Sequence, residues 1–139
     1  MIILDTNVVS EVMRERPDPR VFAWLESCDP VSLFTTAITE AEVRFGIVRL
    51  PSGLRQRKML EEAEEIFRTD LGGRVLAFDR AAAAAFAEIA ARRQKTGTRI
   101  HFADGQIAAI TLVQGARLAT RNVKHFQNCG IDIIDPWTV

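Results

Sequence analysis

The chain has 139 residues, of which 47% are hydrophobic and 26% charged, as in one soluble globular domain. Eighteen basic residues balance eighteen acidic ones, and the zero net charge argues against a protein that coats nucleic acid non-specifically. No apolar run is long enough to span a bilayer, and Met1–Leu4 lacks the basic lead and length of a secretory signal. We therefore expect a single cytoplasmic domain over residues 1–139, without membrane contact.

Short apolar runs of strand character alternate with helical patterns along most of the chain. This alternation predicts βαβ units and a parallel sheet covered by helices on both faces. The two cysteines, Cys28 and Cys129, are far apart in sequence, and two reduced packing thiols are favoured over a disulfide or a metal–thiolate site. The strands are expected at Ile2–Leu4, Val31–Thr35, Val75–Phe78, Arg117–Thr120 and Ile131–Ile134.

Helix boundaries follow from proline, glycine and capping residues between the strands. In the third helix, Ile38, Ala41, Phe45 and Val48 form the expected core stripe. The predicted helices run from Thr6 to about Arg16, from Pro19 onward, from Thr39 to about Leu50, from Leu54 to Leu71, from Asp79 to about Thr96, and from near Asp104 to Gly115.

The first strand ends abruptly in Asp5, Thr6 and Asn7. Open α/β sheets place their ligand sites at the carboxyl ends of strands, so Asp5 is a candidate site residue. All three residues are also good N-caps, and a cap alone would explain Asp5 as fully as it explains Asp79. Three cap-forming residues in succession exceed what one helix start requires.

Glu42 and Asp104 are the other candidate acids. Glu40 has Arg44 four residues later, whereas Glu42 has Gly46 at that spacing, which indicates a half-buried carboxylate facing inward or a plain surface glutamate. Asp104 stands at a helix start, where it is either an N-cap or a ligand beside a slim helix end that a phosphate could approach.

The segment Thr120-Arg121-Asn122 follows the fourth predicted strand. Thr120 and Asn122 can supply neutral oxygens, and Arg121 or Lys124 could face a phosphate, although an ordinary polar turn also fits. His101 fits a surface or packing residue better than a metal ligand.

Carboxylates that arrive from separate elements repel one another and stay ionised together only if a cation neutralises them. Hard oxygen ligands select Mg²⁺ or Mn²⁺, which organise water and phosphate oxygens for displacement at phosphorus. The combined pattern therefore predicts a divalent-metal site built from Asp5, Glu42 and Asp104 that hydrolyses phosphodiesters.

Four segments resemble PIN-domain proteins in order and spacing: Ile3-Leu4-Asp5-Thr6-Asn7, residues 37–46, residues 103–109, and Ala119-Thr120-Arg121-Asn122. The resemblance covers essentially the whole chain and ends in Asp135-Pro136-Trp137, which is similar to the FitB branch of VapC-type toxins. It implies a PIN-like three-layer α/β/α sandwich with a central parallel five-stranded sheet in the order 3-2-1-4-5.

The resemblance also implies Mg²⁺- or Mn²⁺-dependent endoribonuclease activity, as the toxin of a type II toxin–antitoxin system. Asp5, Glu42 and Asp104 match the acidic triad, and Thr6 matches the usual hydroxyl neighbour. Many relatives carry a fourth acid where this chain has Asn122, so any second metal position is expected to be weak or filled only with RNA present. The implied partners are RNA, a VapB/FitA-like antitoxin that blocks the site, operator DNA through that antitoxin, and a second copy of the chain.

Two other classes of function remain open on the sequence alone. The chain could be a binding module of an antitoxin–operator complex with little catalysis. It could instead be a phosphatase or phosphotransferase, although those that phosphorylate an aspartate typically need a second acid two residues later, where this chain has Asn7. Arg44, Arg121 and Lys124 are possible contacts to the RNA backbone, or solvated surface charges.

Overall fold

The computed structural model describes residues 1–139 and contains one five-stranded parallel sheet in the order β3-β2-β1-β4-β5. This order confirms the predicted topology. It places the first and fourth strands side by side at the centre, where the direction of winding reverses. The strands are β1 (Ile2–Leu4), β2 (Leu33–Thr36), β3 (Val75–Leu76), β4 (Arg117–Ala119) and β5 (Asp132–Ile134).

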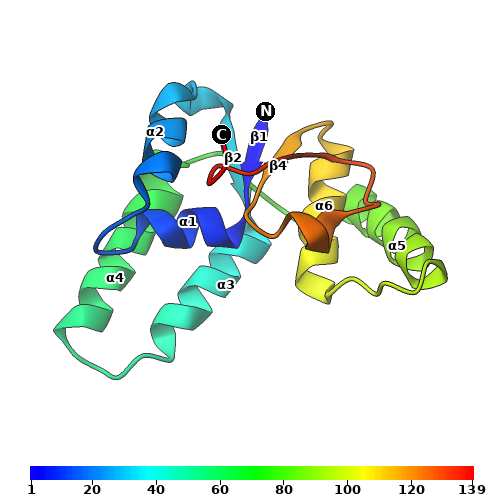
Figure 1. Cartoon of the computed structure of the whole chain (residues 1–139). Coiled ribbons are helices and arrows are strands. Elements are labelled where there is room, and N and C mark those ends of the chain that lie inside the picture. The colour runs from blue at the N-terminus through cyan, green and yellow to red at the C-terminus, as the bar shows by residue number, and fades with distance from the viewer.

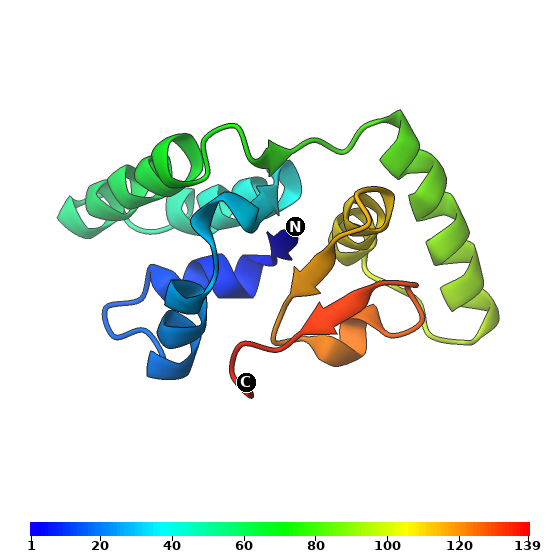
Figure 2. The ribbon, with the colours of Figure 1, turned by 90° about the horizontal axis from the view of Figure 1, so that it is seen from above.

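Helices cover both faces of the sheet, as Figures 1 and 2 show, with the first four α-helices on one side and the last two on the other. No helix is long and apolar enough to cross a membrane. The helical elements are α1 (Thr6–Val12), α2 (Pro19–Ser27), η1 (Pro30–Ser32), α3 (Ala37–Val48), α4 (Leu54–Glu64), the π-helical η2 (Glu65–Asp70), α5 (Arg80–Lys95), α6 (Phe102–Val113) and η3 (Val123–Phe126).

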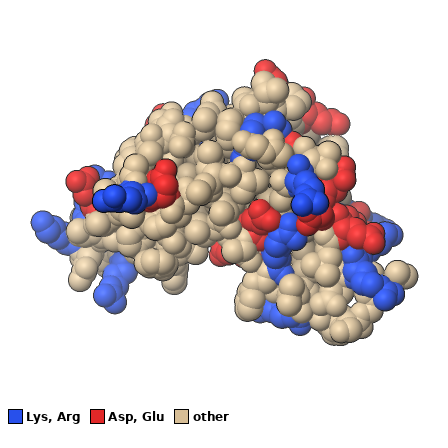
Figure 3. Space-filling model, turned by 180° about the vertical axis from the view of Figure 1, so that it is seen from behind, with Lys and Arg blue, Asp and Glu red and all other residues tan.

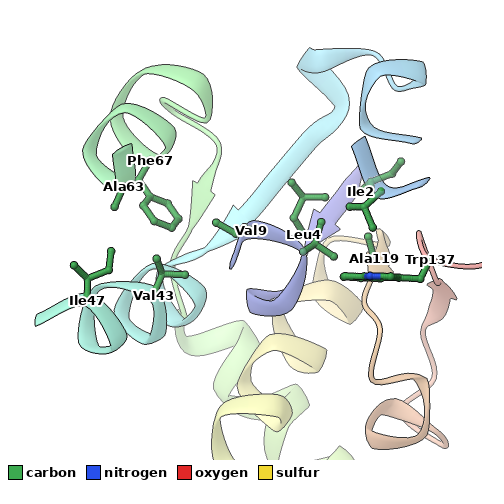
Figure 4. Close-up of a cluster of buried hydrophobic side chains, with 11 residues drawn as sticks. Ile2, Leu4, Val9, Val43, Ile47, Ala63, Phe67, Ala119 and Trp137 are labelled. Atoms are coloured by element: carbon green, nitrogen blue, oxygen red, sulfur yellow. The ribbon is translucent and has the colours of Figure 1, made fainter. Parts of the chain in front are cut away.

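Alternate residues of β1 pack into two separate hydrophobic cores, one on each face of the sheet. Ile2 and Leu4 pack into a cluster with α1, α3, α4 and Trp137 (Figure 4), whereas Ile3 packs into a cluster with α5 and α6. A central strand buried on both faces must be apolar throughout, which is why Ile2–Leu4 has no polar residue. Cys28 and Cys129 are free and pack beside the first and second clusters respectively, which confirms the expectation of two reduced thiols.

Several element boundaries differ from the predicted ones, and side-chain caps explain two of these differences. The second strand starts at Leu33, since Asp29 accepts from the Val31 N–H and starts the 3-10 turn η1. The third helix starts at Ala37, because the Thr36 hydroxyl caps it by accepting from the Thr39 N–H. The first helix ends at Val12, four residues before the predicted Arg16.

The predicted core stripe of α3 is largely wrong. Phe45 and Val48 are exposed, and the buried residues are instead Thr39, Val43 and Ile47. Helix α3 has apolar residues around most of its circumference, so periodicity alone does not select the face that packs on α1 and α4. Figure 4 shows Val43 and Ile47 on the inner side, facing Phe67 and Ala63 of the α4–η2 helix.

Helices α5 and α6 pack tightly at Gly105. A Cβ atom there would lie 2.6 Å from Cε2 of Phe86, so Gly105 is required for helix contact. Phe86 therefore occupies space beside the start of α6, the slim helix end that was expected to be open to a phosphate. We expect Gly105→Ala to destabilise the protein by about 1–3 kcal/mol through overpacking. Gly46→Ala is the matched control, since no atom lies within 4 Å of its Cβ position, and it should stabilise α3 by about 0.5–1 kcal/mol. Thermal unfolding of both variants tests this, and equal melting temperatures would contradict it.

Candidate active site

Asp5 stands at the carboxyl end of β1, in the centre of the molecule. Its backbone N–H donates to Ala119 O of β4, which fixes the residue between the two strands. Its Oδ1 caps α1 by accepting from the Thr6 N–H at 2.8 Å, so the N-cap interpretation is correct. The cap leaves Oδ2 for other partners, and the residue is only 3% exposed. Asp5 is thus a buried carboxylate with more than a capping role.

Thr120 and Asn7 hold the second oxygen of Asp5. The buried Thr120 hydroxyl donates to Asp5 Oδ2 at 2.7 Å, and Asn7 Nδ2 donates to the same oxygen at 3.2 Å. The Thr120 hydroxyl in turn accepts from the Asn122 N–H and from Asn7 Nδ2. The expectation that Thr120 offers a free oxygen to water or phosphate is therefore wrong, because its hydroxyl is fully engaged in positioning Asp5.

Glu42 approaches the same site from α3. The Thr6 hydroxyl donates to Glu42 Oε1 at 2.6 Å, and the Thr39 hydroxyl lies 3.2 Å from that of Thr6. The residue is exposed, so of the two interpretations of Glu42 the surface glutamate is correct and the half-buried carboxylate is wrong. Glu42 lines a groove of about 770 Å³ between α1, α3 and α4, and Gly46, which has no side chain, also lines it. The groove is lined among others by Ser10, Arg14, Glu42, Gly46, Arg55 and Met59.

Asp104 reaches the site from the first turn of α6. The N-cap of this helix is His101, so Asp104 lies inside the helix and does not cap it. A carboxylate in the first turn is favoured by the helix dipole. One Asp104 oxygen, Oδ2, lies 3.3 Å from Nδ1 of His125, and the Asp104 side chain is 20% exposed.

The charges of the other two acids act on Asp5. Burial raises the pKa of Asp5 to about 6, hydrogen bonds from Thr120 and Thr6 oppose this rise, and the charges of Asp104 and Glu42 add to it. Thr6 links two of these acids, since its N–H donates to Asp5 Oδ1 and its hydroxyl donates to Glu42 Oε1. That all three acids, from the end of β1, from α3 and from α6, share one metal ion stays a prediction.

The donor set fits a hydrated hard cation better than a fully protein-coordinated one. No three His, Cys, Asp or Glu side chains are grouped tightly enough to hold a metal ion together. Mg²⁺ keeps several waters and needs only one or two direct carboxylates. Of the roughly four lone-pair positions of a carboxylate, Asp5 uses three in hydrogen bonds, and one on Oδ1 remains.

The residues predicted to contact phosphate differ in whether their side chains already have partners within the chain. Arg44 is paired with Glu40 at 2.6 Å and with Glu64 at 3.1 Å, so it is held away from a role as a free cation. Arg121 is exposed, and its guanidinium carbon lies 5.1 Å from the centre of the Trp137 ring. Lys124 and the Asn122 side chain are exposed next to the site and make no hydrogen bond within the chain.

Two residues of the site were not selected from the sequence. Asn7 bridges the strands, since it donates to Asp5 and its Oδ1 accepts from the Arg121 N–H at 3.1 Å. The position of Asn7, two residues after Asp5, is the sequence signal that could have identified it. His125 beside Asp104 had no sequence signal, because 21 positions separate them and only the docking of η3 on α6 brings them together.

The raised pKa of Asp5 predicts how stability depends on pH without metal. The folded state favours the neutral acid, so its stabilising effect is present at low pH and is lost as pH rises from about 4 to above 6. This loss amounts to about 3 kcal/mol. We expect the stability difference between Asp5→Asn and wild type, measured by denaturation in EDTA, to grow by up to that amount between pH 4 and 7. A difference that is independent of pH would contradict it.

The fold and the site together define a class of protein. Its members are three-layer α/β/α domains with acidic residues beyond the carboxyl ends of the central strands. The PIN domain family matches residues 2–130, and the chain belongs to this family. The chain is 41% identical over 137 residues to VapC ribonuclease Y4jK of Sinorhizobium fredii, covering 99% of this chain and 98% of that protein. It is 37% identical to toxin FitB of Neisseria gonorrhoeae, covering 99% of each.

The fold also matches solved structures closely. A structure of FitAB bound to the IR36 DNA fragment contains a chain that is 37% identical and superposes with a TM-score of 0.94, covering 100% of this chain and 97% of that one. The expected membership in the PIN-domain family and the predicted sheet order are both confirmed.

Proposed function

We propose that this protein is a Mg²⁺- or Mn²⁺-dependent endoribonuclease and the toxin of a type II toxin–antitoxin pair. The observation that carries the proposal is Asp5, a buried carboxylate held by three donors at the junction of β1 and β4, with the charges of Glu42 and Asp104 acting on it. The ribonuclease and toxin names of the full-length relatives support the same reaction.

In the proposed mechanism, Asp5, Glu42 and Asp104 would hold Mg²⁺ directly or through water. The bound ion would polarise the scissile phosphate and lower the pKa of the attacking water. Thr120 and Asn7 keep Asp5 oriented, and Thr6 does the same for Glu42. Asn122 orients water or a phosphate oxygen, Arg121 and Lys124 contact the RNA backbone, and cleavage leaves a 3′-hydroxyl and a 5′-phosphate.

The proposed partners are a VapB/FitA-like antitoxin, operator DNA reached through that antitoxin, and a second copy of the chain. The FitAB–DNA structure supports this setting. The chain has no net charge, and on the face shown in Figure 3 acidic and basic side chains are interspersed around a broad uncharged area. Such a face does not attract DNA on its own, so DNA contact is assigned to the antitoxin. The groove lined by Glu42 gives a partner segment access to that member of the triad.

Cleavage of RNA by the purified chain tests the proposal. We expect total RNA to be cut with Mg²⁺ or Mn²⁺, and cleavage to stop in EDTA and return when metal is added in excess. Asp104→Ala should not cut under any of these conditions. Absence of cleavage by wild type, with retained binding of the antitoxin and its operator, would favour the alternative function of a binding module with little catalysis.

A further inference from the structure

His125 is the one side chain that makes a polar contact with Asp104, and it comes from a separate element of the fold, η3. Its Nδ1 lies 3.3 Å from Asp104 Oδ2, with the imidazole 50% exposed. Nδ1 and Oδ2 are within hydrogen-bond distance without the alignment of a good hydrogen bond, as is common for active sites without their ligands. We propose that His125 is a positioning residue, which holds Asp104 through an Nδ1–H···Oδ2 hydrogen bond so that Oδ1 faces the metal.

The backbone of His125 is fixed from two sides. Its N–H donates to Asn122 O at 3.0 Å, and its carbonyl accepts from Nη1 of Arg93 at 2.8 Å. Arg93 is 3% exposed, and the next residue, Phe126, is 1% exposed in the second core. These contacts hold the η3 turn in place, and the turn positions the imidazole beside Asp104, although the ring itself is half exposed.

Asp104 has no other side-chain partner within the chain. Asp5 and Glu42 each accept hydrogen bonds from neighbouring side chains, whereas the only polar side-chain contact of Asp104 is His125. Carboxylates that bind metals are generally hydrogen-bonded themselves, and loss of such a partner typically costs 10–100-fold in metal affinity or activity. His125 is thus a side-chain hydrogen-bond donor that orients Asp104, as Thr120 is for Asp5.

This inference rests on the proposed function, and binding of Mn²⁺ tests it separately from catalysis. His125→Phe keeps the ring and removes the donor, whereas His125→Asn places an amide N–H near the position of Nδ1. His101→Phe is the matched control, because its ring lies 6.2 Å from that of His125 and does not contact Asp104. Isothermal titration with Mn²⁺ at one pH, with the metal-free melting temperature as a check of folding, compares the variants.

We expect His125→Phe to weaken Mn²⁺ binding by about 10–100-fold, His125→Asn to restore most of it, and His101→Phe to match wild type. Weakened binding in His125→Phe, with a wild type that binds Mn²⁺ but cuts no RNA, supports the inference and contradicts the nuclease. Equal affinity of wild type and His125→Phe, with RNA cleaved by wild type, overturns the inference and leaves the nuclease in place. A wild-type chain that binds no Mn²⁺ overturns both.

Discussion

Asp5→Asn is expected to lower metal-dependent RNA cleavage by well over 100-fold while the fold stays intact. The change removes the charge that attracts the cation, and loss of even an indirect partner of a metal ligand costs 10–100-fold. The asparagine Oδ1 still accepts from the Thr6 N–H, so the cap of α1 survives. Initial rates with Mg²⁺, together with the thermal melting temperature of each protein, measure both effects.

Asp79→Asn is the matched control for this change. Asp79 also follows a strand and caps a helix, since its Oδ1 accepts from the Ala82 N–H, but it is not among the charges that act on Asp5. This variant should cut RNA as wild type does. If Asp5→Asn cuts as fast as wild type, a contaminating nuclease accounts for the activity and the assignment of Asp5 fails.

Arg93→Met is expected to cause the largest loss of stability among single changes outside the two cores, about 3 kcal/mol. The buried guanidinium donates to three backbone carbonyls, those of Thr98, His125 and Gln127, in loops that flank α5 and η3. Methionine fills similar volume and leaves these carbonyls without their charged donor. Thermal unfolding should show a melting temperature lower by roughly 10 °C.

Arg92→Met isolates the effect of burial. Arg92 is the exposed neighbour and donates only to Asn128 O, so its loss should change stability by no more than about 0.5 kcal/mol. Indistinguishable melting temperatures of the two variants would show that the Arg93 hydrogen bonds add nothing beyond those of a surface arginine.

The parts of the fold that depend on local pattern were predictable from sequence. Ile2–Leu4 had to be a central strand because it is apolar on both faces, and a strand followed by Asp5-Thr6-Asn7 predicts both a helix cap and a ligand position. The helical region predicted from Leu54 to Leu71 was also found, as α4 (Leu54–Glu64) followed by η2 (Glu65–Asp70). In each case the residues that decide the structure are neighbours in the chain.

The parts that depend on tertiary packing were not predictable in this way. Phe45 and Val48 have the spacing of a core stripe, but the position of α4 selects Val43 and Ile47. The slim helix end beside Asp104 was expected to be open to a phosphate, but Phe86 packs against Gly105 there. His125 carries no motif, and its place beside Asp104 follows from the Arg93 contacts that fix η3.

The site around Asp5 can form only after β4 has been synthesised, because β1 and β4 are neighbours in the sheet. Asp5 leaves the ribosome before Thr120, the residue that orients it, because 115 positions separate the two in the chain. A nascent chain that has not yet released Thr120 presents Asp5 without its hydroxyl partner and without the strand that buries it. Under the proposed function, the arrangement of Asp5 that RNA cleavage requires is therefore complete only after Thr120 has been synthesised.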